Sequence, residues 1–125
     1  MKVLSWNIRG ISNRGKQHYL RDKISKENPI ILILQETKLI GDKMSKIVSL
    51  CWKGCEMVSL DAKVTAGGLA ICWNPNQLVF KEWWATYRTL TRIFHHVGTS
   101  QSVFLSAVYG LTSVKDKKNF LATII

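Results

Sequence analysis

The chain has 125 residues, of which 46% are hydrophobic and 21% are charged. This composition is typical of a folded globular domain and excludes a disordered tail. The longest apolar run is far shorter than the roughly 18 residues of a membrane-spanning helix, and Asn7 and Arg9 interrupt the apolar start of the chain, so we expect neither a membrane span nor a signal peptide. The net charge of +10 favours a polyanionic partner, nucleic acid first and an acidic membrane surface second.

The first predicted unit consists of a strand, a helix and a second strand. The first strand, Lys2–Gly10, ends in polar residues before a turn, and the helix, Lys16–Glu27, follows a loop over Ser12–Gly15. The helix surface is basic, which suits either a solvated face or a surface that follows a nucleic-acid backbone. The apolar run Ile30–Leu34 then predicts a strand that is buried on both faces.

Polar side chains follow both of these strands. Asn7 ends the first strand, and Gln35 and Glu36 end the stretch Ile30–Lys38. A carboxylate at the exit of a buried strand is held rigidly, which suits a metal ligand, although an ordinary polar residue is as common there. Because sites collect outside the carboxyl ends of strands in a βαβ unit, we expect Asn7 and Glu36 to meet in space.

The remaining chain predicts one more helix, several strands and a C-terminal helix. Paired glycines, Gly67 and Gly68, open one of these strands and indicate either a close approach of the backbone or a simple hairpin entry. The order of elements predicts an α/β or α+β domain with a mixed sheet. In chain order, the predictions are a helix over Gly41–Trp52, strands over Cys55–Leu60, Ala66–Trp73, Leu78–Trp84, Thr86–Val97 and Gln101–Tyr109, and a helix over Ser113–Ile125.

The chain has three cysteines, Cys51, Cys55 and Cys72, and no secretory signal accompanies them. This favours a reducing intracellular compartment. A zinc site formed by Cys51, Cys55 and the pair His95 and His96 is an alternative, but the spacing matches no standard zinc finger, and we interpret the cysteines as structural. Adjacent histidines in a strand point to opposite faces, which excludes a catalytic pair.

Four short motifs occur in order over nearly the whole chain: Ser5-Trp6-Asn7-Ile8-Arg9-Gly10, Leu34-Gln35-Glu36-Thr37-Lys38, Gly67-Gly68-Leu69-Ala70-Ile71-Cys72-Trp73 and Val108-Tyr109-Gly110. Together they resemble the endonuclease/exonuclease/phosphatase superfamily, and most closely the endonuclease domain of plant LINE-type (non-LTR) retrotransposons. The resemblance implies a four-layer α/β sandwich. Residues 1–125 would then form the N-terminal half of such a domain, with the missing C-terminal half as its structural partner.

The resemblance also implies metal-assisted hydrolysis of a phosphodiester, with Mg²⁺, or Mn²⁺ in its place, and no organic cofactor. Glu36 would bind the metal, Asn7 would orient the metal shell or an active-site carboxylate, and Tyr109 would reach the scissile phosphate. Arg9 and Lys38 would add positive charge near the phosphates. DNA is the implied partner, no membrane partner is expected, and the nucleus is the implied compartment.

Two later motifs of the superfamily do not occur in this sequence. A Gly-Asp-Phe-Asn-like motif would supply the base and another ligand, and a Ser-Asp-His-like motif would supply an imidazole. Such groups act as a unit, so we expect the chain by itself to have no meaningful nuclease activity. DNA-repair members carry Asp where this chain has Arg9, and Leu111 replaces the usual Pro. A non-catalytic basic module that binds nucleic acid, and a phosphatase of the same superfamily acting on lipid or inositol phosphates, remain as alternatives.

Overall fold

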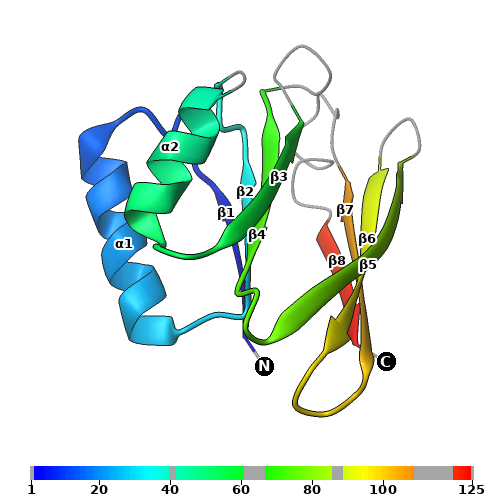
Figure 1. The fold of residues 1–125 in the computed structure, drawn as a ribbon. Coiled ribbons are helices and arrows are strands. Elements are labelled where there is room, and N and C mark those ends of the chain that lie inside the picture. Colours follow the sequence, from blue (N-terminus) through cyan, green and yellow to red (C-terminus); the bar gives the residue numbers. More distant parts are fainter. Residues whose placement is uncertain (1, 40–41, 61–66, 86–88, 109–119, 125) are drawn as a thin grey trace. The chain divides into compact units, whose positions relative to one another are not determined.

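The computed structural model describes residues 2–39, 42–60, 67–85, 89–108 and 120–124 (Figure 1). Its contacts divide the chain into two compact units, Met1–Pro75 and Asn76–Ile125. Among the described residues, two helices and a four-stranded sheet lie in the first unit, and a second four-stranded sheet lies in the other. None of the helices in the described ranges is long and apolar enough to cross a membrane. The predicted mixed α/β class is confirmed.

The first unit begins with the predicted βαβ arrangement. β1 and β2 run parallel, with Val3 opposite Ile31 and Asn7 opposite Gln35. Because the strands are parallel neighbours, their carboxyl ends lie at the same edge of the sheet (Figure 1). The elements are β1 (Val3–Asn7), α1 (Arg14–Glu27) and β2 (Ile31–Gln35).

Helix α1 starts two residues before the predicted position because Asn13 caps it. The Asn13 side chain accepts a hydrogen bond from the Lys16 backbone N–H at 3.0 Å, which satisfies one of the free donors of the first turn. At the other end, Asn28 adopts a left-handed conformation and donates its N–H to the Ile24 carbonyl. Both caps are local signals, and they fix the length of the crossover between the two parallel strands.

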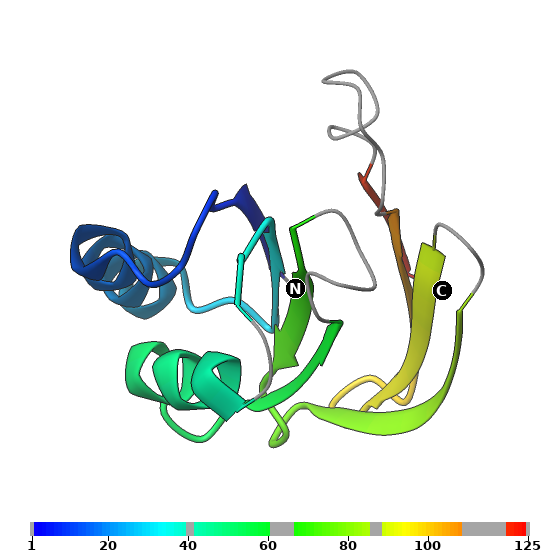
Figure 2. The ribbon, with the colours of Figure 1, turned by 90° about the horizontal axis from the view of Figure 1, so that it is seen from above.

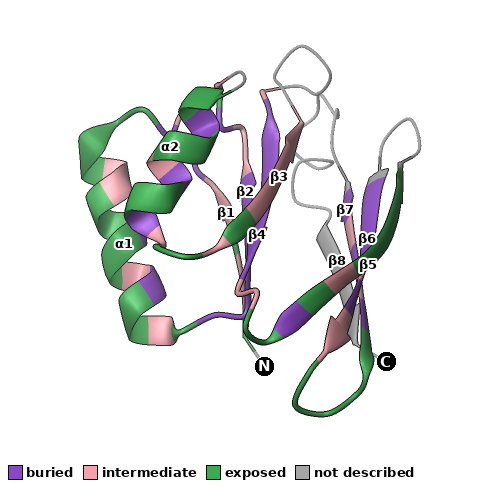
Figure 3. Cartoon of the chain, in the orientation of Figure 1, coloured by how far each residue is buried: buried purple, intermediate pink, exposed green. Residues whose placement is uncertain are grey.

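The buried run Ile30–Leu34 lies at the centre of the first sheet, as predicted. The strand order is β1-β2-β4-β3, so β2 has a neighbour on each side, and no residue of this run is more than 4% exposed (Figure 3). Figure 2 shows both helices on one face of this sheet. The other elements of the unit are α2 (Asp42–Cys51), β3 (Glu56–Leu60) and β4 (Leu69–Trp73), and both β3 and β2 pair with β4 in antiparallel fashion.

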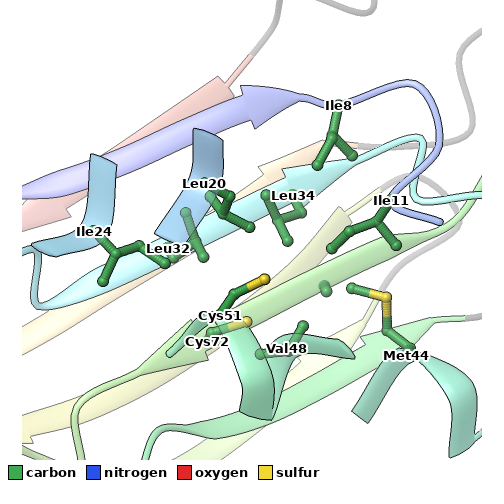
Figure 4. Close-up of a cluster of buried hydrophobic side chains, with 11 residues drawn as sticks. Ile8, Ile11, Leu20, Ile24, Leu32, Leu34, Met44, Val48, Cys51 and Cys72 are labelled. Carbon is green, nitrogen blue, oxygen red and sulfur yellow. The ribbon is translucent and has the colours of Figure 1, made fainter. Parts of the chain in front are cut away.

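A hydrophobic cluster fills the space between this sheet and the two helices. Leu32 and Leu34 of β2 contribute the sheet side of the cluster (Figure 4). Removing such side chains from water supplies the main driving force for this arrangement. The helix side comes from Leu20 and Ile24 of α1 and from Met44, Val48 and Cys51 of α2.

The second unit is an antiparallel sheet in the order β5-β6-β7-β8. A bulge interrupts the pairing of β5 with β6 between Phe80 and Glu82, so Lys81 has no partner in the register. The bulge explains why the alternation of polar and apolar residues in this strand does not identify one buried side. The strands are β5 (Leu78–Ala85), β6 (Thr89–His96), β7 (Ser102–Val108) and β8 (Phe120–Ile124).

The helix predicted over Ser113–Ile125 is wrong for its last residues. Phe120–Ile124 is a strand that pairs with β7, Phe120 opposite Ala107 and Ile124 opposite Val103. Aromatic and β-branched residues such as Phe120, Thr123 and Ile124 favour a strand when a neighbouring strand is available. Ser113, which predicted the start of a helix, lies before this strand and outside the described residues.

Candidate functional site

The ends of β1 and β2 are held side by side beyond the strands themselves. The N–H groups of Ile8, Gly10 and Ile11 donate to the carbonyls of the segment 35–37, at 3.0, 2.8 and 3.1 Å. Asn7 is the last residue of β1 and lies opposite Gln35, and Glu36 is the next residue of the chain. The structure therefore brings Asn7 and Glu36 into neighbouring positions at the edge where the sequence predicts a site.

One cation lies close to the Glu36 carboxylate. Its Oε2 lies 3.8 Å from Arg9 Nε, and the Glu36 side chain is only 14% exposed, whereas that of Arg9 is 73% exposed. An ion pair with one exposed partner at this distance is weak, so the guanidinium remains available to an incoming anion. Lys38 is exposed on the same segment.

The side-chain oxygen of Asn7 is buried and has no hydrogen-bond partner among the described residues. A buried amide oxygen without a partner costs about 1–3 kcal/mol, so native structures rarely leave one unless an ion or a water completes the site. Asn7 is the last residue of β1, and it lies opposite Gln35, the residue before Glu36. Asn7 thus adds a second oxygen of the kind that binds metal ions at the same edge of the sheet.

Three of the predicted site residues have a strained backbone. Arg9, Glu36 and Lys38 have φ angles of 51°, 53° and 58°, in the left-handed region that non-glycine residues rarely adopt. Such a conformation costs about 1–3 kcal/mol for each residue, and it persists where the surrounding structure fixes it, often at functional sites. The predicted site thus coincides with a concentration of backbone strain.

The paired glycines allow β4 to approach this strained segment. Gly67 and Gly68 have φ angles of 99° and 92°, and the Lys38 N–H donates to the Gly67 carbonyl at 2.6 Å. A Cβ on Gly67 would lie 3.2 Å from both Cα and Cγ of Glu36. Close approach is therefore the reason for the glycines, and β4 begins only after them, three residues later than the predicted strand.

We expect Lys38→Gly to be more stable than Lys38→Ala by about 1 kcal/mol. Both variants remove the same charge, but only glycine adopts a positive φ without strain, and this gain exceeds the entropy that glycine adds to the unfolded chain. Urea denaturation followed by circular dichroism measures the difference. Equal stabilities would show that the backbone at position 38 relaxes once the lysine is removed.

Lys16 is a site residue that the sequence did not identify. Its Nζ donates to the carbonyls of Ile8 and Arg9, at 2.7 and 3.0 Å, and so fixes the turn that follows β1. Lys16 lies in the first turn of α1, where a cation is unfavourable unless another group holds it. This position is the feature of the sequence that pointed to a special role for Lys16. Tyr109, the remaining predicted residue, lies outside the described residues.

The cysteines form no metal cluster in the part of the chain that the structure describes. Cys51 and Cys72 are buried and Cys55 is half-buried, and no group of three or more His, Cys, Asp or Glu side chains is arranged there to hold a metal. A hydrogen bond from the Cys72 thiol lowers the pKa of Cys55, and the same bond together with burial raises the pKa of Cys72. His96, in the second unit, bonds Thr99 Oγ1 through Nδ1 at 2.8 Å.

No protein-family model matches the chain, and no curated protein does. Several solved structures are similar to it, among them the following three. The human Nocturnin catalytic domain with bound sulfate anion has a TM-score of 0.65 and 14% identity over 83% of this chain and 47% of that chain. A D. rerio TDP2 humanized by 14 mutations has a TM-score of 0.67 and 16% identity, over 92% of this chain and 52% of that chain. The AP endonuclease LMAP from Leishmania major has a TM-score of 0.62 and 21% identity, over 86% of this chain and 39% of that chain.

These three structures have the endonuclease/exonuclease/phosphatase fold. The chain described here has the same mixed α/β fold, as its motifs predicted. It spans about half or less of the length of each of these three chains. Sequence identities this low establish the likeness of fold and carry no conclusion about substrate or activity.

Proposed function

We propose that the chain is part of a metal-dependent phosphodiester hydrolase, a DNA endonuclease of the LINE retroelement kind that acts in the nucleus. One observation carries the proposal: Asn7, whose buried side-chain oxygen has no hydrogen-bond partner among the described residues, lies opposite Gln35, the residue before Glu36, at the edge where two parallel strands end. The net charge of +10 suits a phosphate backbone. One of the proteins with a similar fold is an AP endonuclease, which agrees with this reaction class.

The donor atoms at this edge fit a hard divalent cation. Mg²⁺ takes oxygen ligands and typically uses one or two carboxylates, several waters and the phosphates of its substrate. Glu36 would supply the carboxylate and Asn7 an amide oxygen, and Mn²⁺ would accept the same ligands. When bound, the metal would polarise a phosphoryl oxygen and offset the charge that develops on it.

The chain's own residues would bind and orient the phosphates. The exposed cations Arg9 and Lys38 are positioned to attract phosphate oxygens, and Arg9 presents a planar fork of donors for this purpose. Lys16 would keep the carbonyls of Ile8 and Arg9 in place and so fix the loop that carries Arg9. We propose that Tyr109 contacts the scissile phosphate, as the motif resemblance implies.

We further propose that the chain by itself does not cleave DNA. The sequence contains neither of the two later motifs that supply a base and an imidazole in the superfamily, and loss of one preorganised group commonly lowers the rate by ~10²–10³. Nicking of a supercoiled plasmid in Mg²⁺ measures this. Nicking by the wild type that Glu36→Ala lacks would contradict the inactivity and would support the site.

Binding of Mn²⁺ tests the site without any need for activity. We expect the paramagnetic ion to broaden first the amide signals of residues 7–10 and 36–38 in the nuclear magnetic resonance spectrum, and excess Mg²⁺ to reverse the effect. Glu36→Gln should weaken binding about tenfold or more, because the charge of the carboxylate is lost while its size is kept. Asn7→Ala should weaken binding as well, and Asn7→Asp should not.

Glu56→Gln is the matched control for this experiment. Glu56 is an exposed carboxylate at the start of β3, in the same unit and away from the carboxyl ends of β1 and β2. Its neutralisation changes the net charge by the same amount as Glu36→Gln. If both variants lose affinity equally, Mn²⁺ responds to overall charge, and the proposed site is wrong.

A further inference from the structure

The three cysteines of the chain gather at one place in the first unit. Cys51 of α2 and Cys72 of β4 belong to the hydrophobic cluster between the sheet and the two helices, and Figure 4 shows both side chains there. Cys55, just before β3, packs against the same cluster. All three are free thiols, and those of Cys55 and Cys72 share a hydrogen bond. The cluster thus holds two thiols in direct contact and a third nearby.

The pairing of β3 with β4 explains the contact between Cys55 and Cys72. Cys72 lies opposite Met57 in the register, and Cys55 precedes Met57 by two residues, so the two side chains lie on the same face of the sheet. Diagonal neighbours of this kind have Cα atoms about 7–8 Å apart and Cβ atoms somewhat closer. A disulfide usually joins Cα atoms about 4.4–6.8 Å apart, so an approach of roughly 1 Å would allow one here.

The two thiols differ in their access to solvent. Cys72 is completely buried, whereas Cys55 is half-buried at the end of the turn between α2 and β3, next to the exposed residues Lys53 and Gly54. A Cβ on Gly54 would meet nothing within 4 Å, so the turn is open on that side. The hydrogen bond from Cys72 lowers the pKa of Cys55. A partly exposed thiol of lowered pKa near a lysine is the kind that oxidants attack first.

Cys51 is the least reactive candidate among the three thiols. Its Sγ donates a hydrogen bond to the Gln17 carbonyl at 3.7 Å, and burial raises its pKa. Both features keep Cys51 protonated, and the protonated thiol is a poor nucleophile. Cys51 is therefore an internal control for the pair formed by Cys55 and Cys72.

We propose that Cys55 and Cys72 are an oxidation site, at which a hydroperoxide converts the two thiols into a reversible disulfide. The Cys55 thiolate attacks one oxygen of hydrogen peroxide, so that an S–O bond forms, the O–O bond breaks, and hydroxide leaves as water with the proton that Cys55 released. The sulfur of Cys72 then attacks the sulfenic sulfur of Cys55, so that an S–S bond forms and the S–O bond breaks. The second hydroxide leaves as water with the Cys72 proton, and the two sulfurs together have given two electrons to the peroxide.

The arrangement favours a reversible reaction over irreversible damage. Because Cys72 already contacts Cys55, the sulfenic acid is captured before a second peroxide can carry it to the sulfinic acid. Disulfides of intracellular proteins are usually transient and serve catalysis or redox sensing. Both thiols belong to the first unit, away from the carboxyl ends of β1 and β2, and the inference does not depend on the proposed hydrolase.

Peptide mapping after oxidation tests the pairing, because trypsin separates the three cysteines. Cleavage after lysine places Cys51 in fragment 47–53, Cys55 in 54–63 and Cys72 in 64–81. After treatment with hydrogen peroxide and blocking of free thiols, we expect fragments 54–63 and 64–81 to be linked, with a mass lower by two hydrogen atoms, and dithiothreitol to separate them. A link that includes fragment 47–53, a link between two chains, or no link would overturn the proposal.

Two serine variants separate the roles of the pair. In Cys72→Ser, we expect the sulfenic acid to persist on Cys55 and to be labelled by dimedone, because the thiol that captures it is absent. In Cys55→Ser, Cys72 should be oxidised at least about tenfold more slowly than in the wild type, because the peroxide cannot reach it directly. Oxidation of Cys72 at the wild-type rate in Cys55→Ser would contradict the proposed order of steps.

Cys51→Ser is the matched control, because a serine hydroxyl can donate to the same Gln17 carbonyl. The link between Cys55 and Cys72 should form in this variant at the wild-type rate, and its loss in a folded variant would overturn the pairing. Alkylation of the wild-type chain by iodoacetamide tests the reactivity without any substitution in the core. We expect Cys55 to react at least about tenfold faster than Cys51 or Cys72, and equal rates would contradict the proposal.

Discussion

Gly68→Ala is expected to destabilise the first unit by about 1–3 kcal/mol more than Gly54→Ala does. Both glycines have a positive φ, 92° and 84°, so both substitutions carry the cost of about 1–2 kcal/mol for a left-handed alanine. A Cβ at position 54 meets nothing within 4 Å, whereas one at position 68 would overlap Oγ1 of the buried Thr37. The difference between the variants therefore isolates that overlap.

Urea denaturation of the two variants measures this difference, and a double variant tests its cause. Thr37→Ala removes the hydroxyl that the new methyl group would meet, so Gly68→Ala should cost less in a Thr37→Ala background than in the wild type. A cost that is unchanged by Thr37→Ala would show that the strain arises elsewhere, for example at the Leu60 carbonyl, 3.6 Å from the same Cβ. Equal costs at positions 54 and 68 would contradict the close approach altogether.

The βαβ unit was predictable because each of its signals is local. The unbroken apolar run Ile30–Leu34 indicates a central strand, and α1 ends at Glu27, as predicted. The cap Asn13 is also a local signal, although the prediction placed it in the loop and began the helix at Lys16. Once two parallel strands are joined by a helix, the meeting of Asn7 and Glu36 follows from topology alone. No tertiary contact had to be known in advance.

Other features depend on contacts between segments distant in sequence, and the sequence pattern does not contain them. The strand Phe120–Ile124 forms because β7 offers it an edge, whereas the preceding Ser and Asp suggested a helix cap. Likewise, the role of Lys16 depends on where the carbonyls of Ile8 and Arg9 point. The positive φ of Glu36 also has no signal in the sequence pattern, because it depends on a neighbouring segment, the one that carries Gly67.

Leu34→Asp is expected to unfold the first unit, whereas Leu50→Asp should change its stability by less than about 1 kcal/mol. Leu34 is fully buried in β2, between Trp6 of β1 and Ala70 of β4, and Leu50 is 66% exposed on α2. Burial of the Leu34 side chain is worth about 1.5–3 kcal/mol, and an unpaired carboxylate in its place adds a larger penalty. The sum is comparable to the 5–15 kcal/mol of a typical domain.

Amide hydrogen exchange of β1, β2 and β4 measures this outcome, because protected amides lose their protection when the unit unfolds. Glu36 follows Leu34 by two residues, and its position depends on the same strand, so we expect Leu34→Asp to abolish Mn²⁺ binding as well. Leu50→Asp keeps the fold and should keep the ion, although it introduces the same charge. Retention of both protection and Mn²⁺ binding in Leu34→Asp would mean that the central strand does not hold the site in place, contrary to the assignment of the ends of β1 and β2 as its framework.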